Sequence, residues 1–381
     1  MPILFCTVIL FLFLKIYFIV KILLHFFIFY DRIYNERLFF AEGVVLITKH
    51  IKSDDENGIL LAGETIKNGG LVAFPTETVY GLGASGFDEN AVKSIFKAKG
   101  RPSDNPLILH IAFLEQAEEI AFLNDNAVSL ARHFWPGPLT VVLPKKKAVP
   151  YCVTGGLETV AVRMPSNETA RKLIIAANVP IAAPSANISG KPSPTTAEDV
   201  AYDMDGKIPV IIDGGPCQIG IESTVVDLTG KVPTVLRPGG ITLDMLQEVL
   251  KDCVMDKGLL EPLKADETPK CPGMKYKHYA PKAEVIVFEN GTESKIDEYL
   301  EKNSDKKLAV YCKNGRKYKC ENIKYWGDNA ADMAKNLFTD LRGFDKEGTE
   351  IILCEAPEMS QLGQSVRNRL YKSAGYNVIK K

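Results

Sequence analysis

The sequence predicts an α/β protein in which short apolar strands alternate with amphipathic helices along 381 residues. Two observations support this class. Short apolar runs typical of buried strands recur between stretches whose apolar residues are three or four positions apart. That alternation stops at 252–281, where prolines and charged residues accumulate without periodicity. Because the length also favours two domains, we expect an open α/β sheet covered by helices and then a smaller α/β unit.

The composition excludes some classes of protein. The formal net charge of −1 argues against a generally basic nucleic-acid binder, so any RNA contact would need a local patch. The eight cysteines are scattered, with no CxxC pair and no cysteine–histidine cluster at zinc spacing. We therefore expect reduced, mostly buried thiols in a cytoplasmic protein, and neither a structural metal nor a disulfide framework.

The first residues do not fit this pattern. The segment from Ile3 to Tyr30 is almost wholly apolar and longer than the ~20 residues that span a bilayer. It lacks the basic start and the small-residue cleavage site of a secretory signal. A membrane anchor, a targeting segment and a translation start assigned too far upstream remain open. Hydropathy alone favours the anchor, whereas we favour an alternative start at Val44 or Leu46 and set residues 1–43 apart.

The stretch 69–110 carries the most information. It predicts a strand at 71–74, a Pro-Thr-Glu-Thr turn, a helix between a capping aspartate and Gly100, and a strand at 107–111. Lys99 and Arg101 flank the helix end. Hydroxyls, backbone amides and cations thus meet at element ends, where an enzyme that handles a polyphosphate would place them.

The remaining elements follow the same rhythm. Further helices are predicted at 57–68, 114–123, 126–134, 168–177 and 243–250, and further strands at 139–143, 160–163, 181–183, 210–213, 224–228 and 234–237. The second unit predicts strands at 284–288, 308–311 and 351–355 and helices at 296–301, 330–342 and 364–373. This order indicates a Rossmann-like parallel sheet with right-handed crossovers.

A series of ordered motifs resembles one known family. The motifs are FPTETVYGLG, the Lys99-Gly-Arg101 triplet, NPLILHI, WPGPLT, VAVRMP, APSAN, SPT, ESTVVD, LRPGG and PGMKYKHYAP. Together they are similar to the threonylcarbamoyl-AMP synthases, in the long form that has a YrdC-like catalytic part. The resemblance covers roughly Val44 to Lys381. It implies a large twisted mixed sheet in a catalytic domain at 44–251, a linker or lid at 252–282 and a C-terminal α/β domain at 283–381.

The resemblance also implies an activity, the synthesis of threonylcarbamoyl-AMP from L-threonine, bicarbonate and ATP with release of pyrophosphate. The product serves modification of the tRNA adenosine beside the anticodon, and other proteins carry out transfer to the tRNA. A carbamate oxygen attacks the α-phosphorus. Because that nucleophile is already anionic, cations and backbone amides rather than an activated serine are needed. Mg²⁺ is expected to arrive with ATP, so no metal-binding residues are assigned.

The family pattern assigns roles to residues of this sequence. The catalytic residues are Lys99 and Arg101. Contacts to ATP are expected from Arg101, Asn105, Thr140, Ser185, Ser193, Arg237, His278 and Tyr279. Contacts to threonine are expected from Thr78, His110, Arg163, Ala183 and Ser223.

Structural roles compete with several of these assignments. Lys99 and Arg101 would also suit the solvated end of a basic helix, and His110 would suit a satisfied core histidine. Arg163 lies in a strand and needs an anionic partner, which a substrate carboxylate or a structural Asp or Glu could supply. The stretch Lys275–Tyr279 reads either as a loop packed on the first domain or as a lid that keeps water from a reactive anhydride.

Two other functions compete with adenylation. An RNA-binding or ribosome-associated module would use a basic concave face and would bind RNA in a salt-sensitive way without ATP turnover. An enzyme that uses carbamoyl phosphate, as in hydrogenase maturation, would carry cysteine-rich finger motifs that this sequence lacks. The membrane is a partner only if residues 1–30 are genuine.

Overall fold

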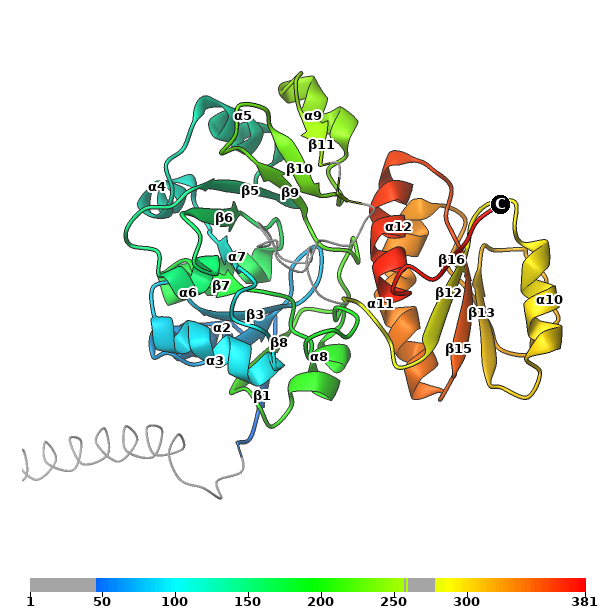
Figure 1. The fold of residues 1–381 in the computed structure, drawn as a ribbon. Helices are drawn as coiled ribbons and strands as arrows, with labels where there is room; N and C mark the ends of the chain where they lie inside the picture. The colour runs from blue at the N-terminus through cyan, green and yellow to red at the C-terminus, as the bar shows by residue number, and fades with distance from the viewer. Residues whose placement is uncertain (1–45, 257, 260–277) are drawn as a thin grey trace, which may run out of the picture. The chain divides into compact units, whose positions relative to one another are not determined.

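The computed structural model describes residues 46–256, 258–259 and 278–381 (Figure 1). The apolar segment Ile3–Tyr30 and the motif residues Lys275, Tyr276 and Lys277 lie outside these residues. Within the described part, no helix combines the length and the hydropathy needed to cross a membrane.

The first α/β unit is built on a large mixed sheet. In the described residues its eleven strands are ordered β1-β8-β2-β3-β7-β4-β6-β5-β9-β10-β11. Parallel pairs such as β4–β6 and antiparallel pairs such as β5–β6 share the sheet, which confirms the predicted mixed sheet. The strands are β1 (Lys49–Lys52), β2 (Val72–Phe74), β3 (Gly81–Ser85), β4 (Ile108–His110), β5 (Leu139–Pro144), β6 (Thr159–Arg163), β7 (Ile181–Ala183), β8 (Val210–Asp213), β9 (Thr224–Asp227), β10 (Thr234–Arg237) and β11 (Val254–Met255).

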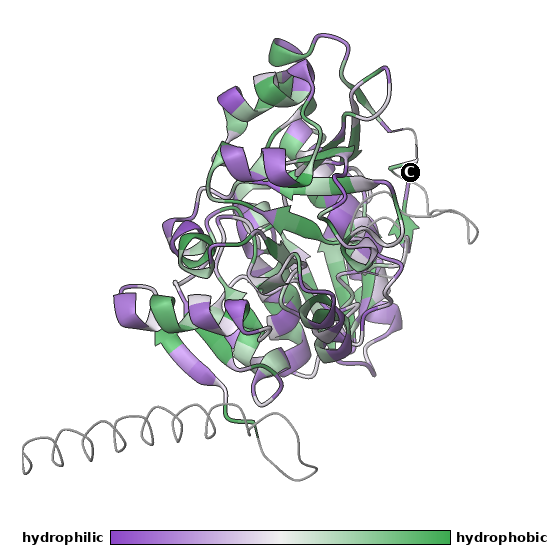
Figure 2. Cartoon of the chain, turned by 90° about the vertical axis from the view of Figure 1, so that its left-hand side faces the viewer, coloured by the Kyte–Doolittle hydropathy of each residue, from purple (hydrophilic) through white to green (hydrophobic). Residues whose placement is uncertain are grey.

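Helices cover both faces of this sheet. They are α2 (Glu56–Lys67), α3 (Glu89–Lys99), α4 (Leu114–Ile120), α5 (Asp125–Phe134), α6 (Tyr151–Thr154), α7 (Glu168–Ala177), α8 (Ala197–Met204) and α9 (Leu243–Val249). Successive residues of β2 enter different apolar clusters: Ala73 belongs to one, while Val72 and Phe74 belong to the cluster that includes α2 and α7. Figure 2 shows apolar strands lying between helices with hydrophilic sides.

The second α/β unit contains a smaller parallel sheet. Its described strands are β14 (Ile323–Tyr325), β13 (Leu308–Cys312), β15 (Ile351–Glu355), β12 (Glu284–Phe288) and β16 (Val378–Ile379), given in spatial order. All of its strand pairs are parallel, as predicted. Helix α10 (Ser294–Lys302) covers one face, and α11 (Ala330–Lys346) and α12 (Gln361–Ser373) cover the other (Figure 1).

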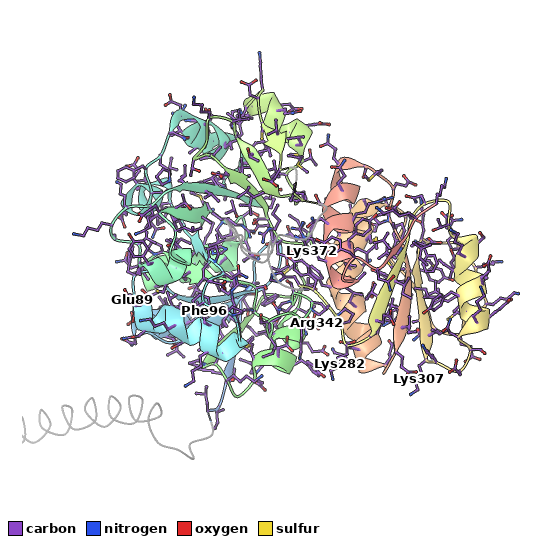
Figure 3. All side chains as sticks on the ribbon, in the orientation of Figure 1. Glu89, Phe96, Lys282, Lys307, Arg342 and Lys372 are labelled. Carbon is purple, nitrogen blue, oxygen red and sulfur yellow. The ribbon has the colours of Figure 1, made fainter. Side chains whose placement is uncertain are left out.

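Helices α11 and α12 also contact the first unit. Val79 and Ile221 of the first unit belong to an apolar cluster otherwise formed mainly by the second sheet and these helices. At the same junction, Arg342 of α11 donates to Asp203 Oδ2 of α8 over 2.8 Å (Figure 3). The two units are therefore joined by an apolar cluster and by buried polar bonds.

Some elements differ from those that the sequence predicts. Helix α3 begins at its capping Asp88 and ends at Gly100, whose φ of 61° is left-handed, as predicted. Strand β3 was not predicted, because its glycines have low strand propensity. They are needed there, since a Cβ on Gly83 would lie 2.7 Å from Ile181 Cγ2 and 2.9 Å from Phe74 Cε1. Strand β11 pairs with β10 inside the stretch predicted as linker.

Candidate functional site

A pocket lies where β4, β6, β7 and β10 end. Its cavity volume is about 60 Å³. Ten of the predicted site residues line it: Thr78, Arg101, His110, Arg163, Ala183, Ser185, Ser223, Arg237, His278 and Tyr279. The other four, Lys99, Asn105, Thr140 and Ser193, are buried residues that do not appear in the pocket wall.

Strand register explains why distant residues meet here. The parallel pair β4–β6 sets His110 beside Arg163. The antiparallel pair β5–β6 sets Thr140 beside the same arginine, and the pair β4–β7 sets Ala183 beside Ile108. These pairings bring residues of β4, β6 and β7 together along one stretch of the sheet, with Thr140 next to it.

The Pro-Thr-Glu-Thr turn after β2 is held by its own hydroxyl groups. Thr76 Oγ1 donates to the carbonyl of Val79 over 2.6 Å and accepts from the backbone N–H of Thr78 over 3.1 Å. Such hydroxyl bonds fix a turn without regular structure. They orient the hydroxyl of Thr78, which accepts a bond from Arg163 Nη1 over 2.9 Å.

Arg163 already has an acidic partner in the protein. Its Nη2 atom lies 2.7 Å from Glu77 Oε1, and both side chains are less than 5% exposed. Burial alone would raise the pKa of Glu77, but the charge and hydrogen bond of Arg163 lower that pKa below its ordinary value. Of the two partners that the sequence left open, the structural glutamate is the one observed. Thr78, His110 and Arg163 are called the Arg163 group below.

His110 is buried and neutral. Burial, followed by the nearby charge of Arg163, lowers the pKa of His110 to about 3. Its Nδ1 lies 3.2 Å from the carbonyl of Ile108, and because a carbonyl can only accept, Nδ1 carries the proton. The ring edge packs against Phe74 at a centroid distance of 6.0 Å. His110 thus has the packing of a core histidine and also lines the pocket.

A second set of cations lies elsewhere in the wall. Arg101 follows α3 and donates to the carbonyls of Asn105 and Pro106 over 3.3 and 3.2 Å. Arg237 ends β10 and donates to the carbonyl and hydroxyl of Ser223, each over 3.0 Å. The charges of both arginines act on His278 and, after the larger effect of burial, help lower its pKa to about 3. Arg101, Arg237 and His278 are called the Arg101 group below.

Lys99 is placed differently from Arg101. It is 1% exposed and donates to the carbonyls of Ser185 and Asn187. Burial, and next the charge of Arg101, lowers the pKa of Lys99 well below its ordinary value. Ser185 in turn donates to Asn187 Oδ1 over 2.5 Å. Lys99 therefore supports the Ser-x-Asn turn from beneath the wall, and its contact with phosphate stays a prediction.

The other buried site residues support those in the wall. Thr140 shares a hydroxyl–hydroxyl bond of 2.8 Å with Ser223, and Ser193 donates to Glu222 Oε1 over 2.6 Å. Asn105 is 1% exposed, and its Oδ1 has no hydrogen-bond partner within the part of the chain that the structure describes. A buried amide oxygen without a donor is a candidate acceptor for a bound ligand.

Sequence reasoning missed three charged residues around the site. The need of Arg163 for an anion indicated a substrate carboxylate or a structural Asp or Glu, but it did not identify Glu77. Glu222 opens the ESTVVD motif, but no role was assigned to it, although it lines the pocket. Arg369 of α12 is fully buried and pairs with Glu222 at 3.1 Å across 147 residues. No local pattern in the sequence indicates such a contact.

His278 and Tyr279, which belong to the PGMKYKHYAP motif, line the pocket. Tyr279 is 5% exposed, and its ring stacks on Phe338 of α11 with centroids 5.1 Å apart. His278 lies beside it, at a ring distance of 5.6 Å, and its buried Nε2 has no hydrogen-bond partner among the described residues. These two residues connect the pocket to the second unit.

Metal-binding and thiol groups are sparse in the part of the chain that the structure describes. No group of three or more His, Cys, Asp or Glu residues is placed there to hold a metal ion. The cysteines of that part are unpaired, and most are buried: Cys152, Cys217, Cys253, Cys312, Cys320 and Cys354. The expectation of reduced, mostly buried thiols is confirmed for these positions.

Two family models match the chain in succession. The model shared by Sua5, YciO and YrdC proteins, described as telomere recombination, matches residues 64–239. The model described as the C-terminal domain of threonylcarbamoyl-AMP synthase matches residues 241–375. The two matches cover most of both α/β units.

Curated proteins and solved structures agree with these models. A threonylcarbamoyl-AMP synthase of Pyrococcus abyssi is 52% identical over 86% of this chain and 96% of its own length. One of Bacillus subtilis is 43% identical over 88% of this chain and 97% of its own length. The crystal structure of P. abyssi Sua5 complexed with L-threonine covers 88% of this chain and 99% of its own, with a TM-score of 0.84 and 50% identity. This chain belongs to the threonylcarbamoyl-AMP synthase family, in its long two-domain form.

Proposed function

We propose that this protein synthesises L-threonylcarbamoyl-AMP from L-threonine, bicarbonate and ATP. The observation that carries the proposal is the convergence of Arg101, Arg163 and Arg237 on one pocket. All three substrates bear negative charge. A wall that gathers guanidinium groups from separate elements suits the binding of anions side by side.

The proposed reaction has two steps. The threonine amine adds to bicarbonate and releases water, which leaves an N-carboxylate. An oxygen of that carboxylate then forms a bond to the α-phosphorus of ATP, and the bond to pyrophosphate breaks. Charge develops on the phosphates in this second step, so preorganised cations lower its barrier.

The two groups of the wall divide the substrates between them. The Arg163 group is proposed to hold threonine, because Thr78 and Arg163 offer a hydroxyl and a guanidinium beside a neutral imidazole. The Arg101 group is proposed to hold the ATP phosphates, with Ser185 and Ser223 nearby in the wall. Mg²⁺ would enter with ATP and keep phosphate and water ligands.

Substrate entry requires His278 and Tyr279 to move. The cavity volume of about 60 Å³ is well below the roughly 300–1,000 Å³ of small-molecule sites. We propose that these residues act as a lid that opens for the nucleotide and closes over the mixed anhydride. The product would then pass to proteins that transfer it to tRNA, and a cytoplasmic location stays a prediction.

Pyrophosphate release tests the proposal. The full-length protein and a chain beginning at Val44 would be given ATP and Mg²⁺ with or without threonine and with or without bicarbonate. Release that needs both threonine and bicarbonate is expected. A folded sample that leaves ATP intact and binds RNA in a salt-sensitive way would instead favour the RNA-binding alternative.

A further inference from the structure

One arginine of the second α/β unit reaches the pocket wall of the first. Arg369 on α12 is 0% exposed. Its Nε lies 3.1 Å from Glu222 Oε2, and its Nη1 donates to the carbonyl of Pro238. Glu222 lines the pocket, and Pro238 directly follows Arg237 of the same wall. A single side chain thus holds two segments that carry pocket residues.

The second of these segments has little freedom to adjust. Ser365, one turn before Arg369 on α12, donates to the carbonyl of Gly239 over 3.0 Å. A Cβ on Gly239 would lie 2.4 Å from the backbone nitrogen of Thr224, so the loop packs directly on the start of β9. Helix α12 therefore fastens the loop that follows Arg237 at two successive residues.

Glu222, in the first of these two segments, is an acidic residue that lies among cations. Glu222 Oε1 accepts from Ser193 Oγ over 2.6 Å, and the charges of Arg369 and Arg237 face the carboxylate. Burial alone would raise the pKa of Glu222, but these two charges and the Ser193 bond lower it overall. An ionised carboxylate in this wall would repel a polyphosphate unless a cation neutralised it.

We infer that Arg369 is a positioning residue for the nucleotide side of the pocket, because it neutralises Glu222 and holds the loop after Arg237. This inference rests on the proposed function for the identity of the nucleotide. It assigns the C-terminal domain an indirect part in binding ATP, through Glu222 and the loop after Arg237. The recorded partners of Arg369 include no member of the Arg163 group, so threonine binding should be affected less.

Binding of Mg²⁺–ATP without threonine, measured by calorimetry, tests the inference independently of turnover. Arg369→Met should weaken ATP binding roughly tenfold or more, since it removes one of the two arginine charges that compensate the buried carboxylate of Glu222. The double variant Arg369→Met/Glu222→Gln should recover most of the affinity, because the glutamine carries no charge and its oxygen still accepts from Ser193. Arg369→Lys should fall between these variants.

The pH dependence of ATP affinity is a measurement that a purely structural role of Arg369 would not affect. Without Arg369, the pKa of Glu222 should rise, because the largest of the charges that lower it is removed. Lowering the pH then protonates the carboxylate and should restore part of the ATP affinity of Arg369→Met. Wild type should show no such recovery, nor should the double variant. His278 and Arg101 line the same pocket but are unchanged in all of these proteins.

Arg367→Met is a matched control on the same helix. Arg367 is 6% exposed and bonds to Pro357, Asn290 and Tyr371, all within the second unit. Its loss should lower the unfolding temperature without changing the Kd for ATP. Equal weakening of ATP binding by Arg367→Met and Arg369→Met would overturn the inference.

Two further results would be equally decisive. A double variant as weak as Arg369→Met would show that the charge of Glu222 is not the cause. If Arg369→Met fails to fold, Arg369→Lys, which keeps the charge but not the guanidinium bonds to Glu222 and Pro238, must still weaken ATP binding, and unchanged binding in that variant overturns the inference. Wild type that binds no ATP would overturn the proposed function as well, which distinguishes the two failures.

Discussion

Arg163 and Glu77 form an ion pair of 2.7 Å at the Arg163 group, and both side chains are almost fully buried. The charge of this arginine is therefore already neutralised within the protein. A threonine carboxylate bound there, as proposed, would have to share the guanidinium with Glu77. Nη1, which bonds to Thr78, lies on the same guanidinium, so the pair also fixes the orientation of the substrate-side hydroxyl.

Removing Arg163 should affect stability and threonine use separately. Arg163→Ala leaves Glu77 buried without its cation, which should cost ~3 kcal/mol in the free energy of unfolding. It should raise the KM for threonine more than the Kd for ATP. Arg163→Ala/Glu77→Gln should regain stability in denaturant titrations but not threonine use. If the double variant used threonine normally, Arg163 would serve only to pair with Glu77.

Arg101→Ala should leave the fold intact and remove a cation that is proposed to bind the ATP phosphates. Pyrophosphate formation should fall ~10²–10³-fold, which is typical for loss of one preorganised charge-stabilising group. Lys97→Ala is the control, because Lys97 is an exposed cation on α3, the helix that precedes Arg101. Steady-state rates and unfolding temperatures would be compared. Equal rates for the two variants would place the phosphates elsewhere.

Lys99→Met should differ from Arg101→Ala in its effect on stability. The carbonyls of Ser185 and Asn187 would lose a buried donor, at a cost of about 1–3 kcal/mol. Weaker ATP binding should therefore accompany a lower unfolding temperature. An unchanged unfolding temperature combined with lost ATP binding would instead support the direct phosphate contact that the sequence predicts.

The buried histidines should make the fold sensitive to mild acid. The pKa values of His110 and His278 are lowered from 6.5 to about 3, so the unfolded chain binds protons between these values that the folded chain does not. Stability is then lost as the pH falls below 6.5, by up to ~1.4 kcal/mol per pH unit for each histidine. The unfolding free energy of His110→Gln should vary less between pH 7 and 5. The lowered pKa of Glu77 acts only below its ordinary 4.5, outside this range.

Tyr279→Ala should shorten the lifetime of the product. Stacking on Phe338 holds Tyr279 over the pocket, and the proposed lid excludes water from the anhydride. Pyrophosphate release should continue, while intact threonylcarbamoyl-AMP recovered by chromatography should decline. Tyr202→Ala, at a tyrosine of α8 that is 62% exposed, should behave as wild type. A normal product lifetime in Tyr279→Ala would contradict the lid.

Local signals account for what the sequence predicted well. The cap at Asp88 and the stop at Gly100 are decided by neighbouring backbone groups, so α3 was predicted almost to the residue. Short apolar runs marked most of the strands because a strand buried on both faces needs no alternation. The motifs then identified ten of the residues that line the pocket.

Non-local contacts account for what the sequence could not show. The glycines of β3 are dictated by Phe74 and Ile181, which are apparent only once the strands pair. Lys99 and Arg101 look alike in the sequence. Only the packing of α3 against the Ser-x-Asn turn shows that Lys99 supports this turn while Arg101 lines the pocket. Arg369 lies on a helix with no motif of its own.

The contact between Arg369 and Glu222 spans 147 residues. The two residues are therefore synthesised at different times. A ribosome adds ~5–20 residues per second, so about 7–30 s separate the synthesis of the glutamate from that of its arginine. During that interval the first unit also lacks the apolar partners of Val79 and Ile221. Until α12 has left the ribosome, the nascent protein should thus expose Val79 and Ile221 and carry the Glu222 carboxylate without the arginine of α12.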